Sequence, residues 1–176
     1  MFEDISKISL RALEPSDSTF LYKWENDPDV WKVSDTLTPF SMFQIEQYIL
    51  NSENIYSNKQ VRLMIELHQA IGDRTIGSID LYDFDPFHLR AGVGIFIDGA
   101  YRRKGFAFKA LDLIEKYAFQ TLELHQLYCL ISADNLSSVK LFEARNYVLT
   151  GTKKDWLKKN NHFLDQYQYQ LINPSQ

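Results

Sequence analysis

Cysteine, glycine and proline are scarce in this sequence, and neither sign of charge dominates it. Its 176 residues include 1 Cys, 7 Gly and 5 Pro. The single cysteine, Cys129, excludes an intramolecular disulfide and gives no support to a secreted disulfide scaffold. So few glycines and prolines exclude collagen-like and low-complexity chains. The net charge of −4 argues against a generic nucleic-acid binder, which needs a basic surface.

Long apolar runs and metal-ligand spacings are also missing. No run approaches the roughly 18 residues that a membrane-spanning helix needs. Residues 1–7 carry acids where a secretory signal is basic. The four histidines and the cysteine do not have the spacing of a structural zinc site. We therefore expect a cytoplasmic protein with no metal and with neither nucleic acid nor membrane as a partner.

Apolar and aromatic residues are plentiful, at 45% and 14% of the chain. At ~150 residues per domain, the length predicts a single domain over residues 1–176. Alternating or continuous apolar residues predict strands at 8–13, 61–67, 76–81, 91–97, 127–131, 148–157 and 163–171. Apolar residues three and four apart predict helices after Pro15, Ser41, Gly105 and Asn135, and a turn is expected at 83–86.

The order of these elements predicts an α/β (α+β) protein. Three central strands follow one another as an antiparallel meander, and a strand–helix–strand unit then supplies one parallel crossing. We expect a mixed, mostly antiparallel sheet of about seven strands, with helices on both faces. A hairpin is expected around residues 159–161, where asparagines tolerate positive φ.

The stretch from Ile95 to Ala107 carries the strongest chemical signal. A strand ends, Arg102, Arg103 and Lys104 follow, and a helix begins at Gly105. Unpaired backbone N–H groups and the helix dipole favour an anion at such a helix start. The small residues let phosphates approach the backbone, so the segment suits a pyrophosphate. A helix start behind a solvated basic loop accounts for the same spacing equally well.

Two blocks of sequence resemble the GNAT superfamily of acyl-CoA N-acetyltransferases. Residues 102–107, RRKGFA, match the family's Gln/Arg-x-x-Gly-x-Gly/Ala motif, and residues 135–147, NLSSVKLFEARNY, are similar to its second motif. Residues 10–13, 26–28 and 76–81 and the hairpin around Trp156 resemble the branch of ribosomal-protein N-terminal and polyamine acetyltransferases. The resemblance implies the GNAT fold, with a bulge near Gly94 that splays the parallel strand pair.

The resemblance also implies how acetyl-CoA would bind. The backbone of Phe96 and Ile97 would pair with the pantetheine arm like an added strand. The N–H groups of residues 102–107 would hold the pyrophosphate, and Asn135 would bond the pantetheine or acetyl group. The implied cofactor-binding residues are Phe96, Ile97, Arg102, Arg103, Lys104, Gly105, Phe106, Ala107, Asn135, Ser138 and Lys140. Taken alone, Asn135 is more often a helix cap, and Ser138 and Lys140 are more often helix surface than ligands.

The sequence departs from the family at both usual acid/base positions. The tyrosine that protonates the leaving thiolate is replaced by Phe142, and a strand glutamate is replaced by Gly92. Water can take over, because a CoA thiolate is a reasonable leaving group, or another group acts. The candidate catalytic residues are Asp80, His88 and Tyr128. Each also has a plain structural interpretation, as a solvent-facing strand residue, an exposed loop histidine and a strand aromatic.

Acids and aromatics interleave where we expect the acceptor. The candidate substrate-binding residues are Trp24, Asp29, Trp31, Tyr82, Asp83 and Asp85. An acidic, aromatic mouth suits a cationic amine such as a polyamine or a peptide N-terminus, although an ordinary solvated acidic face has the same composition. We expect acetyl transfer to a primary amine. The alternative is an acetyl-CoA-binding module with weak or no catalysis, and a homodimer is possible in either case.

Overall fold

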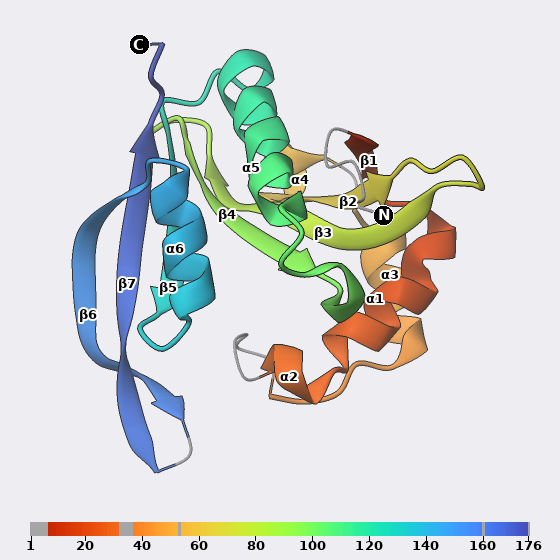
Figure 1. Cartoon of the computed structure of the whole chain (residues 1–176), viewed down its shortest axis with the longest axis horizontal. Helices are drawn as coiled ribbons and strands as arrows, with labels where there is room; N and C mark the ends of the chain where they lie inside the picture. Colours follow the sequence, from red (N-terminus) through yellow and green to blue (C-terminus); the bar gives the residue numbers. More distant parts are fainter. Residues whose placement is uncertain (1–6, 32–36, 53, 160, 176) are drawn as a thin grey trace.

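The computed structural model describes residues 7–31, 37–52, 54–159 and 161–175. Figure 1 shows a curved sheet with helices packed on it. The strands are β1 (Ile8–Ala12), β2 (Val61–Leu67), β3 (Arg74–Asp85), β4 (Arg90–Ile97), β5 (Gln126–Ser132), β6 (Val148–Lys159) and β7 (His162–Ile172). The helices are α1 (Ser18–Glu25), α2 (Pro28–Trp31), α3 (Met42–Leu50), α4 (Ile55–Asn58), α5 (Phe106–Lys116) and α6 (Leu136–Ala144). Short turns of other helix types are η2 (Pro15–Asp17), η3 (Gly99–Tyr101) and η4 (Tyr117–Thr121).

The seven strands form one sheet in the order β1-β2-β3-β4-β5-β7-β6. The pair β4–β5 is parallel, and the other neighbouring pairs are antiparallel. This confirms the predicted mixed sheet with one parallel crossing. The crossing exists because α5 returns the chain to the β4 edge and so places β5 beside β4 in the same direction.

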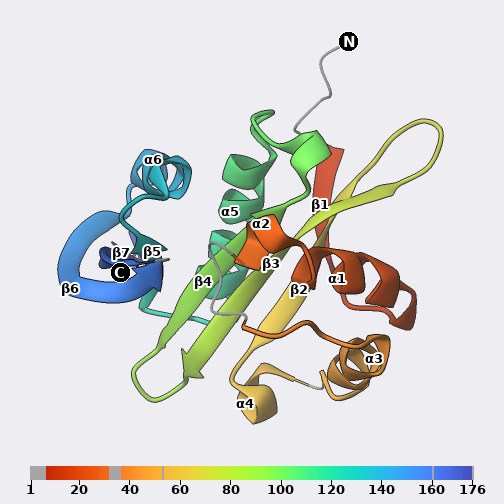
Figure 2. The ribbon, with the colours of Figure 1, turned by 90° about the horizontal axis from the view of Figure 1, so that it is seen from below.

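Helices cover both faces of the sheet, as predicted, and each face has its own core. On one face, Ala110, Leu111 and Ile114 of α5 are fully buried against the strands, because they recur at helical spacing. On the other face, α1 and α3 pack through Leu21 and Ile45 onto Met64 of β2. Figure 2 shows α5 and α6 on one side of the strands and α1 and α3 on the other.

Local sequence signals explain most of the element boundaries. Ser41 caps α3 as predicted: its hydroxyl accepts from the backbone N–H of Gln44, whose side chain accepts in return from Ser41 N–H. The turn expected at 83–86 is wrong in position. Asp83 and Asp85 belong to β3, and the connection to β4 comes after them. Asn160 and Asp35, an acid counted with the acceptor region, lie outside the described residues.

No helix among the described residues is long and apolar enough to cross a membrane. Within the described residues the longest helix is α5, with 11 residues. One face of α5 is buried and the opposite face is polar.

Candidate functional site

The parallel strands β4 and β5 are paired over a short distance and then part. Their register joins Arg90 to Gln126, Ala91 to Leu127 and Gly92 to Tyr128, and no further pair follows in residues 54–159. Yet β4 continues to residue 97 and β5 to residue 132. We call residues 93–97 of β4 and 129–132 of β5 the parted strands. Their facing backbone edges lack a strand partner from each other, so an extended ligand arm can add hydrogen bonds there.

The strands do not part because of a bulge near Gly94, so that expectation is wrong. The β3–β4 register is regular from the Gly77–Ile97 pair to the Tyr82–Gly92 pair, and it passes through Gly94 without a shift. The irregularity lies on β3 between residues 82 and 85, where Asp83 has a φ of 49°. The extra residue on β3 increases the local twist next to the last β4–β5 pair.

Tyr82 lies over Gly92, the position at which the sequence departs from the glutamate that the resemblance implies. A Cβ added to Gly92 would lie 2.3 Å from Cε2 of Tyr82, so only glycine fits under the ring. Burial raises the pKa of the Tyr82 hydroxyl, partly offset by a hydrogen bond from the backbone of Leu130. The side chain therefore reaches from β3 across β4 to the parted part of β5.

Tyr128 stands beside Tyr82 at the last paired position of β5. The two rings meet edge-on with centroids 5.9 Å apart, and the Tyr128 hydroxyl donates to Oδ2 of Asp83 at 3.2 Å. Burial and the Asp83 carboxylate raise the pKa of Tyr128 to about 12. Tyr128 is therefore protonated at neutral pH, and it can donate a hydrogen bond but cannot serve as a base.

Asp80 is held in an ion-pair network. Its Oδ1 lies 2.6 Å from Nε of Arg62, whose Nη1 lies 2.6 Å from Oε1 of Glu25. Burial alone would lower the pKa of Arg62, but the Asp80 carboxylate outweighs it and the pKa is raised. The guanidinium also lies 5.4 Å from the ring centroid of Tyr48. This network fixes β2 to β3 and to α1 beneath the acceptor face.

His88, the third candidate catalytic residue, lies in the exposed turn between β3 and β4. Its ring packs edge-on against Phe87, with centroids 4.8 Å apart. Its backbone N–H donates to Oδ1 of Asp85 at 2.9 Å. These contacts stabilise the turn, so the structure gives His88 a structural role and does not bring it to the parted strands.

The start of α5 has the features that favour an anion. Gly105 has a φ of 87°, which a glycine adopts without strain, and no side chain of the described residues caps the first turn. Arg102, Arg103 and Lys104 are exposed around it. The side chain of Phe106 is buried at 1% exposure, so this residue can offer a ligand its backbone N–H only. Free donors, positive charge and a permissive backbone thus meet at one place.

Arg102 also folds back onto the end of β4. Its Nε donates to the carbonyl oxygen of Ile97 at 2.8 Å, and its guanidinium lies 5.6 Å from the ring centroid of Phe96. Phe96 in turn packs its ring against Trp24, with centroids 5.1 Å apart. The basic loop is therefore anchored to the end of β4, whose edge toward β5 is unpaired after Gly92.

The second sequence block starts α6, and here the capping interpretation holds. The side-chain oxygen of Asn135 accepts from the backbone N–H of Ser138 at 3.2 Å. Lys140 is exposed, and Phe142 is buried at 3% exposure with its ring edge-on to Tyr147. The position of the family's tyrosine is thus occupied by a core side chain without a proton to donate.

The predicted acceptor residues separate into two groups. Trp24 is buried at 5% exposure and its Nε1 donates to Asp98, so it belongs to the core and not to an acceptor surface. Trp31 donates its indole N–H to the carbonyl oxygen of Glu25 at 2.6 Å, and Asp29 is exposed on α2. The others lie at or beside a cavity of about 720 Å³. The cavity is lined by Lys59, Asp83, Phe84, Asp85, Pro86, Arg90, Gln126, Tyr128, Leu130, Lys153, Gln168 and Gln170.

The cavity and the parted strands adjoin, because Leu130 belongs to both and Tyr128, the last paired residue of β5, also lines the cavity. Sequence reasoning did not select the glutamines of β7 or Lys153. The signal was readable: Gln166, Gln168 and Gln170 recur at every second position, which is the pattern of one strand face. A glutamine row on one strand face indicates a polar surface that can bind a ligand.

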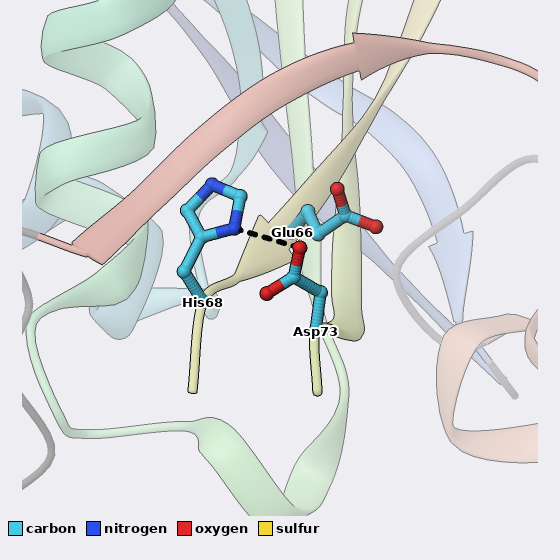
Figure 3. A group of neighbouring side chains, drawn as sticks. All are labelled: Glu66, His68 and Asp73. Carbon is cyan, nitrogen blue, oxygen red and sulfur yellow. Dashed lines mark ion pairs between the residues drawn. The ribbon is translucent and has the colours of Figure 1, made fainter. Parts of the chain in front are cut away.

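One group of described residues has metal-ligand chemistry, at the β2–β3 hairpin. Potential ligand atoms of Glu66, His68 and Asp73 lie within 4.8 Å of one another (Figure 3). Each already has a partner: Glu66 accepts from Arg11 at 3.0 Å, and Nδ1 of His68 lies 3.0 Å from Oδ2 of Asp73. Nε2 of His68 is 2.9 Å from the Ser9 hydroxyl. The contacts explain how β1 and the hairpin are joined, and the adjacent guanidinium disfavours a cation.

Known proteins share this architecture. An acetyltransferase (GNAT) domain model matches residues 7–145. A spermidine N(1)-acetyltransferase of Vibrio cholerae is 27% identical over 83% of this chain and 82% of its own length. The crystal structure of a spermidine N-acetyltransferase from Vibrio cholerae with CoA and spermine covers 95% of this chain and 96% of its own, at 24% identity and a TM-score of 0.86. A dodecameric structure from the same organism has 25% identity and a TM-score of 0.78, and covers 95% of this chain and 94% of its own.

The family model spans most of the chain, and it includes both the basic loop before α5 and the start of α6. The resemblance first seen in two short motifs therefore extends through the parted strands and the helices on both faces. The chain belongs to the GNAT family of N-acetyltransferases.

Proposed function

We propose that this protein transfers the acetyl group of acetyl-CoA to the primary amine of a small molecule or a protein N-terminus. The observation that carries the proposal is the parting of β4 and β5 beside an uncapped, cation-flanked helix start. The pantetheine arm would run along residues 93–97 like an added strand. The pyrophosphate would lie at the backbone N–H groups of residues 102–107, with Arg103 and Lys104 facing it.

The reaction is direct attack of a neutral amine on the thioester. A C–N bond forms, the C–S bond breaks, the nitrogen loses a proton, and the thiolate sulfur gains one. Phe142 cannot supply that proton. The hydroxyl of Tyr128, with a pKa of about 12, is a poor proton donor to a thiolate whose conjugate thiol has a pKa of about 8.5. We therefore assign the proton exchange to water. The Tyr128 proton is donated to Asp83, so we assign to Tyr128 a hydroxyl oxygen that can accept a hydrogen bond from the amine.

The acceptor and the assembly are proposed by analogy. The similar proteins include spermidine N-acetyltransferases, which supports an amine acceptor for this chain. One of them forms a dodecamer, which supports a homo-oligomer here, a dimer being the simplest.

Two measurements test the proposal. Acetyl-CoA at 100 times its Kd should stabilise the folded protein by about 2.7 kcal/mol. For a chain of this size, that is a rise in Tm of roughly 5–11 °C. Thiol release in the presence of an amine panel then reports turnover. An unchanged Tm would remove both the enzyme and the acetyl-CoA-binding alternative. A raised Tm without thiol release for any amine would favour the alternative.

A further inference from the structure

The acceptor cavity is not the acidic mouth that the sequence suggested. Its charged side chains are three cations, Lys59, Arg90 and Lys153, and two acids, Asp83 and Asp85. A site built for a polycation should have the opposite balance, because cations would otherwise repel the ligand at close range.

The two acids also differ in how much of their hydrogen-bond acceptor capacity remains free for a ligand. Asp85 accepts from two backbone N–H groups of the following turn, and its Oδ2 lies 3.2 Å from Nη2 of Arg90. These contacts lower the pKa of Asp85, and they occupy most of its acceptor positions. Asp83 accepts from Tyr128 at the boundary with the parted strands. One carboxylate, next to the reaction centre, is therefore placed to attract an ammonium group.

The two lysines keep their charge for a ligand. Among the described residues, no carboxylate forms an ion pair with Lys59 or Lys153. Nζ of Lys153 lies 4.7 Å from the ring centroid of Trp156, a contact that holds the side chain and does not neutralise it. Glutamine side chains between the charged groups add neutral donors and acceptors.

We propose that the acceptor is a small amine that carries its own anionic group, a carboxylate or a phosphate. The proposal rests on the acetyltransferase function proposed above. The ammonium end would face Asp83 and Tyr128, beside the parted strands, and the anion would face Lys59 and Lys153. A cavity of about 720 Å³ is of the size that encloses small-molecule ligands.

Matched amine pairs test the proposal. Lysine is 1,5-diaminopentane with an added carboxylate, and glucosamine 6-phosphate is glucosamine with an added phosphate. Thiol release from acetyl-CoA should give a kcat/KM about twofold to fivefold higher for the anionic member of one pair, since an exposed ion pair contributes up to about that much. A higher kcat/KM for lysine identifies a carboxylate, and one for the sugar phosphate identifies a phosphate. A preference for diaminopentane and spermidine overturns the inference and leaves the acetyltransferase function standing. If no amine is acetylated, the proposed function fails as well.

Charge reversal separates the cavity lysines from general electrostatics. Lys153→Glu and Lys59→Glu should each reduce the preference for the anionic amine by about twofold to fivefold. Lys158→Glu is the control, because Lys158 is exposed on β6, the strand that holds Lys153, and does not line the cavity. An unchanged preference in both cavity variants, or an equal loss in the control, contradicts the proposal. Circular dichroism of each variant checks that the fold is kept.

Discussion

Gly92 is required by the ring above it, and this requirement predicts a measurable coupling. The Cβ of Gly92→Ala would lie 2.3 Å from Cε2 and 2.4 Å from Cζ of Tyr82, far inside van der Waals contact. Either the Tyr82 ring moves off β4 or the strands shift. Overpacking of this kind costs about 1–3 kcal/mol. No positive φ is recorded at Gly92, so the alanine adds no backbone strain.

The expected loss of stability is a fall in Tm of about 2–12 °C for a chain of this size. Thermal and urea unfolding would measure it. The matched control is Gly94→Ala, two residues along the same strand, whose Cβ would lie 3.8 Å from Cε1 of Tyr82 in ordinary contact. That control should change the free energy of unfolding by less than about 0.5 kcal/mol, or stabilise the protein slightly.

A double-mutant cycle identifies the ring as the cause. In a Tyr82→Ala background the obstacle is gone, so Gly92→Ala should cost almost nothing there. The coupling energy should be about 1–3 kcal/mol. A fully neutral Gly92→Ala, or a cost that is equal in both backgrounds, would refute the reasoning that the Tyr82 ring excludes a side chain at position 92.

Three further predictions concern the start of α5, the core side of α6 and an ion pair on α5. Gly105→Val should abolish the acetyl-CoA-dependent rise in Tm, because a branched side chain blocks the backbone and disfavours a φ of 87°; a rise like that of the wild type contradicts the anion site. Phe142→Tyr should keep or raise the rate of thiol release, and a large fall in rate would show that packing against Tyr147 matters more. Hydrogen bonds from Lys109 and Lys116 lower the pKa of Asp112 to about 2 from its ordinary 3.8. The ionised carboxylate therefore stabilises the fold above about pH 4, and this stabilisation is lost as the pH falls toward about 2. Unfolding of Asp112→Asn across pH 2–7 should show a deficit that shrinks toward pH 2, and a constant deficit would contradict this.

Periodicity predicted the fold well because each face of the sheet has a separate core. The helical i, i+1, i+4 spacing of Ala110, Leu111 and Ile114 and the alternation at 61–67 correspond to buried faces in the structure. The β3–β4 connection was misplaced, because Asp83 and Asp85 are turn-forming residue types that here sit in a bulged strand. Local propensity cannot register a bulge that the neighbouring strand determines.

The candidate site was predictable in its backbone features and much less in its side chains. The basic loop and Gly105 could be read from a motif whose residues are contiguous. The roles of Asp80 and Trp24 depend on Arg62 and Asp98, which are far away in sequence and meet them only in the folded chain. The sign of charge in the cavity likewise depends on Lys59 and Lys153, which come from distant elements. A count of acidic residues along the sequence does not show which of them are paired with cations in the folded chain.

The short parallel pairing has a consequence for cooperativity. Strands β1–β4 and β5–β7 are joined in the sheet through three registered residue pairs, while β5 and β7 share seven. The side chain of Tyr82 adds a further link across the same line. A common core joins the two groups of strands, so amide hydrogen exchange should find the β4–β5 joint less protected than the strands on either side of it. A ligand arm laid along the parted strands would act as an eighth strand, and it would raise the protection of that joint.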